Sequence, residues 1–212
     1  MYDRKPKSYF ANARHDIVAK LPEGCDSILE VGCGAGGTGE LALQSGRCTR
    51  YDAVELFNYA AETAQRKLTQ VVVGDVEEVD LPWEERTFNA LIMSEVLEHL
   101  RDPEATLQRL VPLLKAGAVV FASSPNVSQR RVIKELIRGN WPAEDKGVFD
   151  RTHLRWFTPR TYQAMFENAG LVVDEVGPLP PIGPRGRLLN LLTGSRFSHV
   201  TWGQINLKAH KP

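Results

Sequence analysis

The chain has 212 residues, with 26 basic and 26 acidic side chains and an isoelectric point near 7. This length suits one domain with a full core, so we expect residues 1–212 to form a single domain. The balanced charge argues against a nucleic-acid binder, which usually carries a basic surplus. No apolar run reaches membrane length, and no signal peptide is recognisable at the N-terminus. The three cysteines have no C-x-x-C spacing, so a reducing cytoplasm is expected.

Short apolar runs alternate with amphipathic segments along the chain. We expect strands at 27–31, 50–55, 70–75, 88–94, 117–124, 171–176 and 200–211. We expect helices at 37–45, 58–68, 102–114 and 158–170. Asp102 and Thr158 are predicted N-caps, because each precedes a proline at the first helical position. Strands separated by helices indicate right-handed crossovers and an α/β fold with a Rossmann-like, doubly wound, mostly parallel sheet.

The stretch "ILEVGCGAGG" at 28–37 begins in the first expected strand and continues into a glycine-rich turn. Gly32, Gly34 and Gly37 match G-x-G-x-x-G, which is typical of dinucleotide sites. Gly32, Gly34 and Gly36 equally match G-x-G-x-G, which suggests S-adenosylmethionine. Ligands of such sheets bind outside the carboxyl ends of the strands, where this turn lies. The glycines alone leave both cofactors open.

Acidic residues at three successive strand ends favour one of these cofactors. Glu30 precedes the glycine turn, where its charge would repel a pyrophosphate and attract the ammonium of a methionine moiety. Glu55 ends the second strand, where a carboxylate accepts both ribose hydroxyls, as it also does in NAD enzymes. Asp75 ends the third strand and could accept from an adenine amino group. The pattern favours S-adenosylmethionine, with an NAD-dependent oxidoreductase as the alternative.

These motifs resemble those of class I S-adenosylmethionine-dependent methyltransferases, over residues 8–176. The resemblance is carried by "ILEVGCGAGGTGE", "FNALIMSEVLEHLRDP" and "DRTHLRWFT". It extends to the bacterial members found alongside glycosyltransferases and surface-polysaccharide enzymes. It implies a seven-stranded sheet with the last strand antiparallel, S-adenosyl-L-methionine as cofactor, and methyl transfer to an oxygen of a small molecule or glycan precursor. A fold that binds the cofactor without catalysis, as the partner of another enzyme, is a further alternative.

The resemblance also implies roles for individual residues. The methionine part of the cofactor is expected at Glu30, Gly32, Cys33 and Gly34, the ribose at Glu55 and Leu56, and the adenine at Gly74, Asp75 and Val76. Ser94 and Glu95 match the loop that closes over the cofactor, although many members carry aspartate in place of Glu95. Tyr9 and Arg14 match a cap over the cofactor, within an N-terminal cap-helix segment at 1–24.

Two histidines are candidate catalytic residues, because a hydroxyl nucleophile benefits from a base with a pKa near neutrality. His99 lies just beyond the fourth expected strand, near the position of the cofactor's methyl group. His153 lies in the segment after the fifth strand, where this fold commonly builds its acceptor pocket. A structural role in fixing a loop is the alternative for each. The sequence shows no metal constellation, so no metal site is predicted and a metal-assisted mechanism is disfavoured.

Substrate specificity is expected to lie in one insert, and a second segment lies outside the strong resemblance. The insert at 126–158 carries a predicted apolar helix stripe of Val132, Ile133, Leu136 and Ile137, and its arginines and aromatic rings could seat a sugar and its phosphate. The segment at 177–199 is expected to be a loop with a short helix before the last strand. It is interpreted as a lid, a homodimer contact or a membrane-surface contact.

Overall fold

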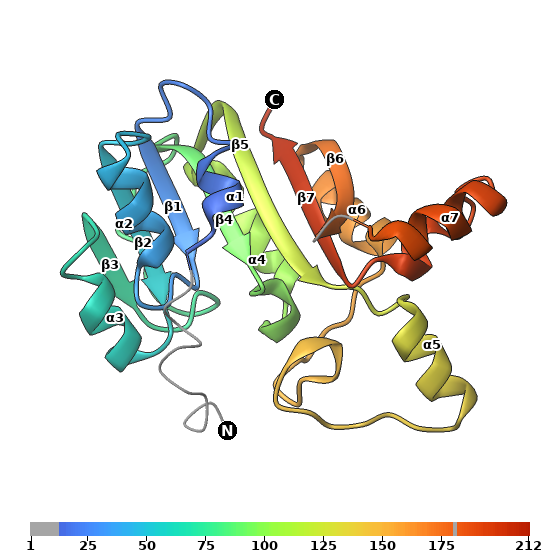
Figure 1. Ribbon diagram of the computed structural model, residues 1–212. Coiled ribbons are helices and arrows are strands. Elements are labelled where there is room, and N and C mark those ends of the chain that lie inside the picture. The colour runs from blue at the N-terminus through green and yellow to red at the C-terminus, as the bar shows by residue number, and fades with distance from the viewer. Residues whose placement is uncertain (1–12, 180–181) are drawn as a thin grey trace.

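A seven-stranded sheet organises residues 13–179 and 182–212, the part of the chain that the computed structural model describes (Figure 1). The strands are β1 (Ser27–Val31), β2 (Arg50–Glu55), β3 (Gln70–Val73), β4 (Phe88–Ser94), β5 (Leu114–Pro125), β6 (Val172–Leu179) and β7 (Gln204–His210). Their order in the sheet is β3-β2-β1-β4-β5-β7-β6. Strand β7 runs antiparallel to both β5 and β6, and the remaining pairs are parallel. The predicted Rossmann-like sheet with an antiparallel last strand is confirmed.

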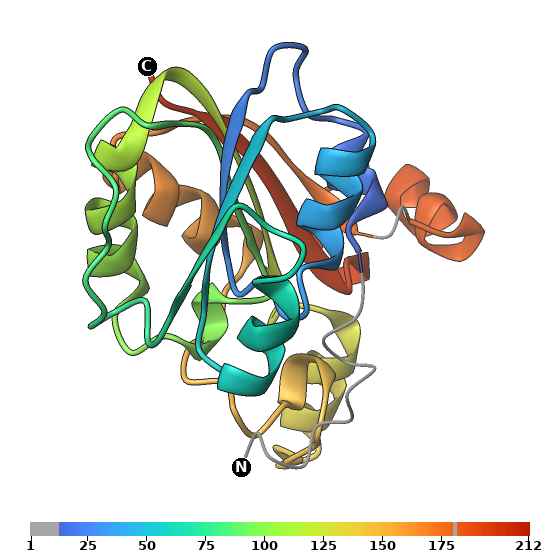
Figure 2. The same ribbon diagram turned by 90° about the vertical axis from the view of Figure 1, so that its left-hand side faces the viewer.

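Helices cover both faces of this sheet (Figure 2). One face packs against α1 (His15–Val18), α2 (Gly37–Gln44) and α3 (Asn58–Ala64), and the other against α4 (Pro103–Leu110) and α6 (Pro159–Asn168). Side chains alternate between the two cores: Ile28 belongs to the first and Leu29 to the second. Burial on both faces explains why the central strands are almost wholly apolar.

The two predicted helix starts are confirmed by their caps. The Asp102 carboxylate accepts a hydrogen bond from the Ala105 amide at 2.9 Å, and Pro103 follows it. The Thr158 hydroxyl accepts from the Thr161 amide at 3.2 Å. Each cap satisfies an amide that the first turn would leave without an intrahelical partner. The caps thus fix the residues at which α4 and α6 begin.

The predicted boundaries are wrong at the C-terminal strands. Strand β6 continues to Leu179 rather than ending at residue 176, because its pairing with β7 extends to Leu179 opposite Gln204. The segment expected to begin the last strand instead starts with a 3₁₀ turn, Ser198–Thr201. The helix expected within 177–199 is α7 (Pro184–Leu192), which projects from the sheet (Figure 1).

The insert between β5 and α6 lies beyond the carboxyl ends of the parallel strands (Figure 1). It contains α5 (Arg130–Ile137) and a 3₁₀ turn (Gly147–Phe149) around a small core of Val132, Val148 and Phe149. The predicted apolar stripe of α5 is only partly buried: Leu136 is 55% and Ile137 82% exposed. Within the described residues, no helix has the length and apolarity needed to cross a bilayer.

Candidate functional site

A cavity of about 680 Å³ opens at the carboxyl ends of the parallel strands, beside the switch point between β1 and β4. Every predicted site residue that the structure describes lines it: Arg14, Glu30, Gly32, Cys33, Gly34, Glu55, Leu56, Gly74, Asp75, Val76, Ser94, Glu95, His99 and His153. Tyr9 lies outside the described residues. The fold therefore gathers residues from four strand ends and the insert around one space.

The Glu55 carboxylate holds the glycine turn in place. Its Oε2 accepts a hydrogen bond from the Gly34 amide at 2.7 Å, and its Oε1 accepts from the Phe57 amide at 3.0 Å. Burial raises the pKa of Glu55, and the hydrogen bonds from the backbone of Phe57 and Gly34 lower it. Each oxygen retains a lone pair, so this fixed carboxylate can still accept from a vicinal diol.

Glu30 lies deeper than the sequence suggested. Its side chain is buried, and the Tyr51 hydroxyl donates to its Oε2 at 2.9 Å. Burial raises the pKa of Glu30 to about 7, and the hydrogen bond from Tyr51 opposes that shift. Glu30 is therefore partly protonated in the free protein near neutral pH. A cation placed beside Glu30 would restore the ionised form.

Asp75 is partly engaged by its neighbours. Its Oδ1 accepts from the Glu77 amide at 2.9 Å, and its Oδ2 lies 3.1 Å from the Arg101 guanidinium, whose side chain is 57% exposed. An exposed ion pair of this kind is weak and easily exchanged for another partner. Asp75 can therefore still face a ligand at the end of β3.

Arg14 reaches the site from the start of α1. Its Nη1 donates to the Ser94 hydroxyl at 2.9 Å and to the Ser123 hydroxyl at 3.1 Å. Its other nitrogens pair with Asp16 at 2.8 Å. The guanidinium thus ties the start of α1 to the ends of β4 and β5, at the wall of the cavity.

Glu95 has a strained backbone at the end of β4. Its φ is +57°, a left-handed conformation that residues other than glycine rarely adopt. Its amide donates to the Ser123 carbonyl at 3.0 Å, and its Oε2 accepts from the Gln204 side chain at 3.0 Å. Such strain persists where the surroundings determine it and is concentrated at functional sites.

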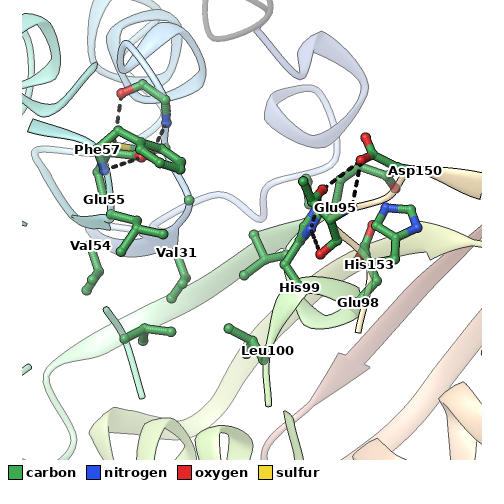
Figure 3. A pocket seen from close by; sticks show the side chains of 18 of the residues that line it. Val31, Val54, Glu55, Phe57, Glu95, Glu98, His99, Leu100, Asp150 and His153 are labelled. Atoms are coloured by element: carbon green, nitrogen blue, oxygen red, sulfur yellow. Dashed lines mark hydrogen bonds between the residues drawn. The ribbon is translucent and has the colours of Figure 1, made fainter. Parts of the chain in front are cut away.

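The insert is fastened to the turn after β4 through one carbonyl. The amides of Leu154 and Arg155 both donate to the Glu98 carbonyl, at 2.8 and 3.0 Å. This places His153 against His99, with their ring centroids 4.7 Å apart and the planes tilted by 64° (Figure 3). The two candidate catalytic histidines, far apart in the sequence, therefore form one cluster.

A hydrogen-bond relay orients the His99 ring. Its Nδ1 lies 3.2 Å from the Thr152 carbonyl, which can only accept, so Nδ1 carries the proton. Thr152 is itself held by Asp150, whose Oδ1 accepts from the Thr152 hydroxyl at 2.7 Å and amide at 3.0 Å. In the neutral ring this leaves the lone pair on Nε2.

Glu98 is buried beside these histidines. Its side chain is 1% exposed, and neither carboxylate oxygen accepts a well-formed hydrogen bond from the described residues. Burial raises the pKa of Glu98 well above its usual range, and the nearby charge of Glu95 raises it further. A carboxyl group in this position needs a proton or a cation close by.

Comparison with known proteins decides the family. The model of a family described as "Methyltransferase domain" matches residues 2–176. The chain belongs to this methyltransferase domain family. It is 28% identical to a ubiquinone biosynthesis O-methyltransferase of Xanthomonas axonopodis pv. citri, over 76% of this chain and 68% of that protein. It is 29% identical to the enzyme of the same name from Caulobacter vibrioides, over 90% and 73%. An S-adenosylmethionine-dependent methyltransferase from Archaeoglobus fulgidus shares the fold, with a TM-score of 0.65, 19% identity and 97% coverage of both chains.

S-adenosylmethionine is the cofactor of this methyltransferase, and the residues of the cavity fit it. Glu30 lines the cavity beside Gly32 and Gly34, where a dinucleotide would need to place its pyrophosphate. Two carboxyl groups instead suit a cationic amine and a ribose diol. The NAD-dependent oxidoreductase alternative is not supported. Neither relative is named for a polysaccharide pathway, so the narrower resemblance to the glycosyltransferase-associated group stays a prediction.

Part of the cluster around His99 in this methyltransferase was not predicted from the sequence. Glu98, Thr152 and Asp150 also line the cavity. Glu98 stands next to His99 in "EVLEHL", and Asp150 and Thr152 stand in "DRTH", so the signal was adjacent to the histidines. The ligand atoms of Glu98, His99 and His153 all lie within 4.8 Å of one another, an arrangement that can hold a metal ion. The sequence-based prediction of no metal site did not anticipate this geometry.

Replacing Glu55 with alanine should weaken S-adenosylhomocysteine binding by roughly 1–3 kcal/mol, the range for losing hydrogen bonds to a charged group. Part of this loss comes from the cofactor and part from the Gly34 amide that Glu55 holds. Calorimetric titration measures it, with Glu62→Ala on the exposed side of α3 as the control. Unchanged affinity in Glu55→Ala would contradict the ribose assignment.

Cofactor affinity should rise with pH through about 7. In the free protein, Glu30 is protonated below its pKa of about 7. A bound ammonium favours the ionised carboxylate, so cofactor binding releases this proton at low pH. S-adenosylhomocysteine should therefore bind about tenfold more weakly at pH 6 than at pH 8. The Tyr51 hydroxyl has its pKa raised far above this window, while Glu55 and Arg14 also face Glu30. Glu30→Gln should bind weakly and lose this pH dependence; an unchanged profile in that variant would assign the proton elsewhere.

Proposed function

We propose that this methyltransferase transfers the methyl group of S-adenosylmethionine to an oxygen atom of a small-molecule acceptor. The observation that carries the proposal is the continuity of the cavity, which runs from the glycine turn and Glu55 to His99 and His153. The relatives named above are O-methyltransferases, which supports oxygen as the atom methylated. Acceptors with a sugar hydroxyl belong to the same proposal.

The cofactor supplies a methyl group on a sulfonium, and the protein must place an acceptor oxygen in line with it. In this proposal Glu30, Glu55 and the glycine turn hold the cofactor at the ends of β1 and β2. Fixed positioning of two reactants supplies a large part of the acceleration in such a displacement. Closure of Glu95 and the insert over the cavity would keep competing water away.

The acceptor hydroxyl is proposed to lie beside His99 and His153. Both line the cavity, and the insert that carries His153 also contributes Lys146, Arg151 and Leu154 to its wall. The hydroxyl must lose its proton as the new O–C bond forms, and imidazole groups are suited to this role near neutral pH. The basic side chains of the insert favour acceptors that carry an acidic group.

A panel of acceptors tests this function. The full chain would be incubated with S-adenosylmethionine and aromatic acids with one hydroxyl, aromatic acids with two adjacent hydroxyls, or sugar nucleotides. Release of S-adenosylhomocysteine is measured, and donor hydrolysis without acceptor is subtracted. We expect turnover with at least one hydroxylated class, and none with the matching O-methylated compound. Saturable S-adenosylhomocysteine binding without turnover on any class would favour a catalytically silent binding partner.

A further inference from the structure

We propose that Glu98, His99 and His153 bind one divalent transition-metal ion at the acceptor end of the cavity. The catalytic use of that ion rests on the oxygen acceptor proposed above, whereas its binding does not. Each residue offers one ligand atom, and these atoms lie within 4.8 Å of one another. A single ion about 2 Å from each atom fits this spacing.

The fold builds the cluster rather than leaving it to flexible side chains. Glu98 and His99 lie in the 3₁₀ turn Leu97–His99 directly after β4. His153 is brought to them because the next two amides of the insert donate to the Glu98 carbonyl. Figure 3 shows Glu98, His99 and His153 grouped at one end of the cavity, away from Glu55. Ligands held on fastened backbone lose little entropy when an ion binds.

The protonation of His99 is the one that a metal ligand requires. Its Nδ1 donates to the Thr152 carbonyl, and Thr152 is held by Asp150. Protein metal sites commonly fix a ligating imidazole in this way, by a hydrogen bond from the nitrogen that does not bind the ion. The lone pair of His99 is thereby placed on Nε2, the second ring nitrogen.

Glu98 gives the second, independent indication of a ligand. Its carboxylate is 1% exposed, and neither oxygen accepts a well-formed hydrogen bond from the described residues. The half-buried Glu95 adds a second carboxyl, whose buried Oε1 also lacks a hydrogen-bond donor among those residues. Buried acidic groups in such numbers are stable when they coordinate a cation. The cluster therefore has the charge and the lone pairs that a dication needs.

The donor set indicates which class of ion binds. Two imidazole nitrogens and one carboxylate suit Zn²⁺ and similar first-row ions, whereas Mg²⁺ prefers oxygen ligands. Three protein ligands leave at least one coordination position for another molecule, as in catalytic zinc sites. All three residues line the cavity, so that position can be reached by an acceptor.

The ion would act on the acceptor hydroxyl. An oxygen bound to a divalent ion has a lowered pKa, and its proton passes to water. The resulting oxyanion then forms the O–C bond while the methyl S–C bond breaks, which leaves S-adenosylhomocysteine. An acceptor with two adjacent hydroxyls would bind such an ion through both oxygens, which makes vicinal diols and catechols the favoured substrate class.

Metal titration of the full chain tests the site without any acceptor or methyl transfer. Chelator-treated protein would be titrated with ZnCl₂ and, in parallel, with MgCl₂. We expect one equivalent of Zn²⁺ to bind, and Mg²⁺ to bind at least about tenfold more weakly because of its ligand preference. Thr152→Val keeps the carbonyl that accepts from His99 and removes only the hydroxyl bond to Asp150, so Zn²⁺ binding should weaken by about tenfold, the lower end of outer-shell effects. Glu98→Gln and His153→Gln should weaken it more.

The exposed His15→Gln serves as the matched control and should bind Zn²⁺ as the native protein does. Retained S-adenosylhomocysteine binding shows that each variant is folded. Absence of stoichiometric Zn²⁺ binding to the native protein would overturn the proposal. Binding that survives both Glu98→Gln and His153→Gln would also overturn it. Neither result bears on whether the protein methylates oxygen, which the acceptor panel tests separately.

Discussion

His153→Ala is expected to lower turnover by about 10²–10⁴-fold, the range for losing a group that handles the proton of a reacting hydroxyl. S-adenosylhomocysteine affinity should be nearly unchanged, because His153 lies on the insert whereas the glycine turn is held by Glu55. The loss is expected whether His153 takes the proton itself or holds an ion that acidifies the hydroxyl. Steady-state rates with an acceptor from the panel, together with calorimetry, measure both quantities.

A purely structural role for His153 predicts a different result. The variant would then lose folding or cofactor affinity, with no loss confined to the chemical step. His15→Ala is the control, since that histidine is exposed on α1. Full turnover in folded His153→Ala together with an inactive His99→Ala would transfer the role to His99. Full activity in both variants would show that the acceptor needs no histidine, as expected for an amine.

Gly34→Val is expected to abolish saturable S-adenosylhomocysteine binding. Gly34 has a φ of +55°, and its amide is bonded to Glu55 at the wall of the cavity. A β-branched side chain is strained in this conformation and would occupy space beside the cofactor. Calorimetry at concentrations far above the native dissociation constant measures the loss.

Gly46→Val separates lost binding from backbone strain. Gly46 has a φ of +67° in an exposed turn after α2, and a Cβ there would meet no atom within 4 Å. The variant should bear a comparable strain yet bind S-adenosylhomocysteine as the native protein does. Normal binding in Gly34→Val would place the cofactor elsewhere, whereas lost binding in both variants would point to general destabilisation.

Patterns of residues close together in the sequence predicted the central strands of the sheet and the starts of two helices. The bounds of β1, β2 and β4 match the expected ranges, because strands buried on both faces are nearly continuous apolar runs. Asp102 and Thr158 cap their helices as expected, since capping depends on residues close in sequence. The end of β6 depends on pairing with β7, and this tertiary contact leaves no local signal.

The cofactor half of the site was more predictable than the acceptor half. Glu30, Glu55 and Asp75 lie at or just beyond the ends of successive strands, and parallel strands bring their carboxyl ends to one edge. The cluster of Glu98 with His153 depends on two backbone hydrogen bonds from a distant segment to the Glu98 carbonyl. The raised pKa of Glu30 depends on burial, which the sequence does not express.

Transfer of a labelled methyl group tests the central claim most directly. The full chain would be incubated with S-adenosylmethionine carrying ¹³C in its methyl group and with a small-molecule extract of bacterial cells, and the products followed by carbon-detected NMR. Methyl transfer to oxygen predicts a new methoxy signal that requires the native protein and is absent with Gly34→Val. A new signal from a methyl group on nitrogen or carbon, or no enzyme-dependent signal beyond cofactor breakdown, would contradict it.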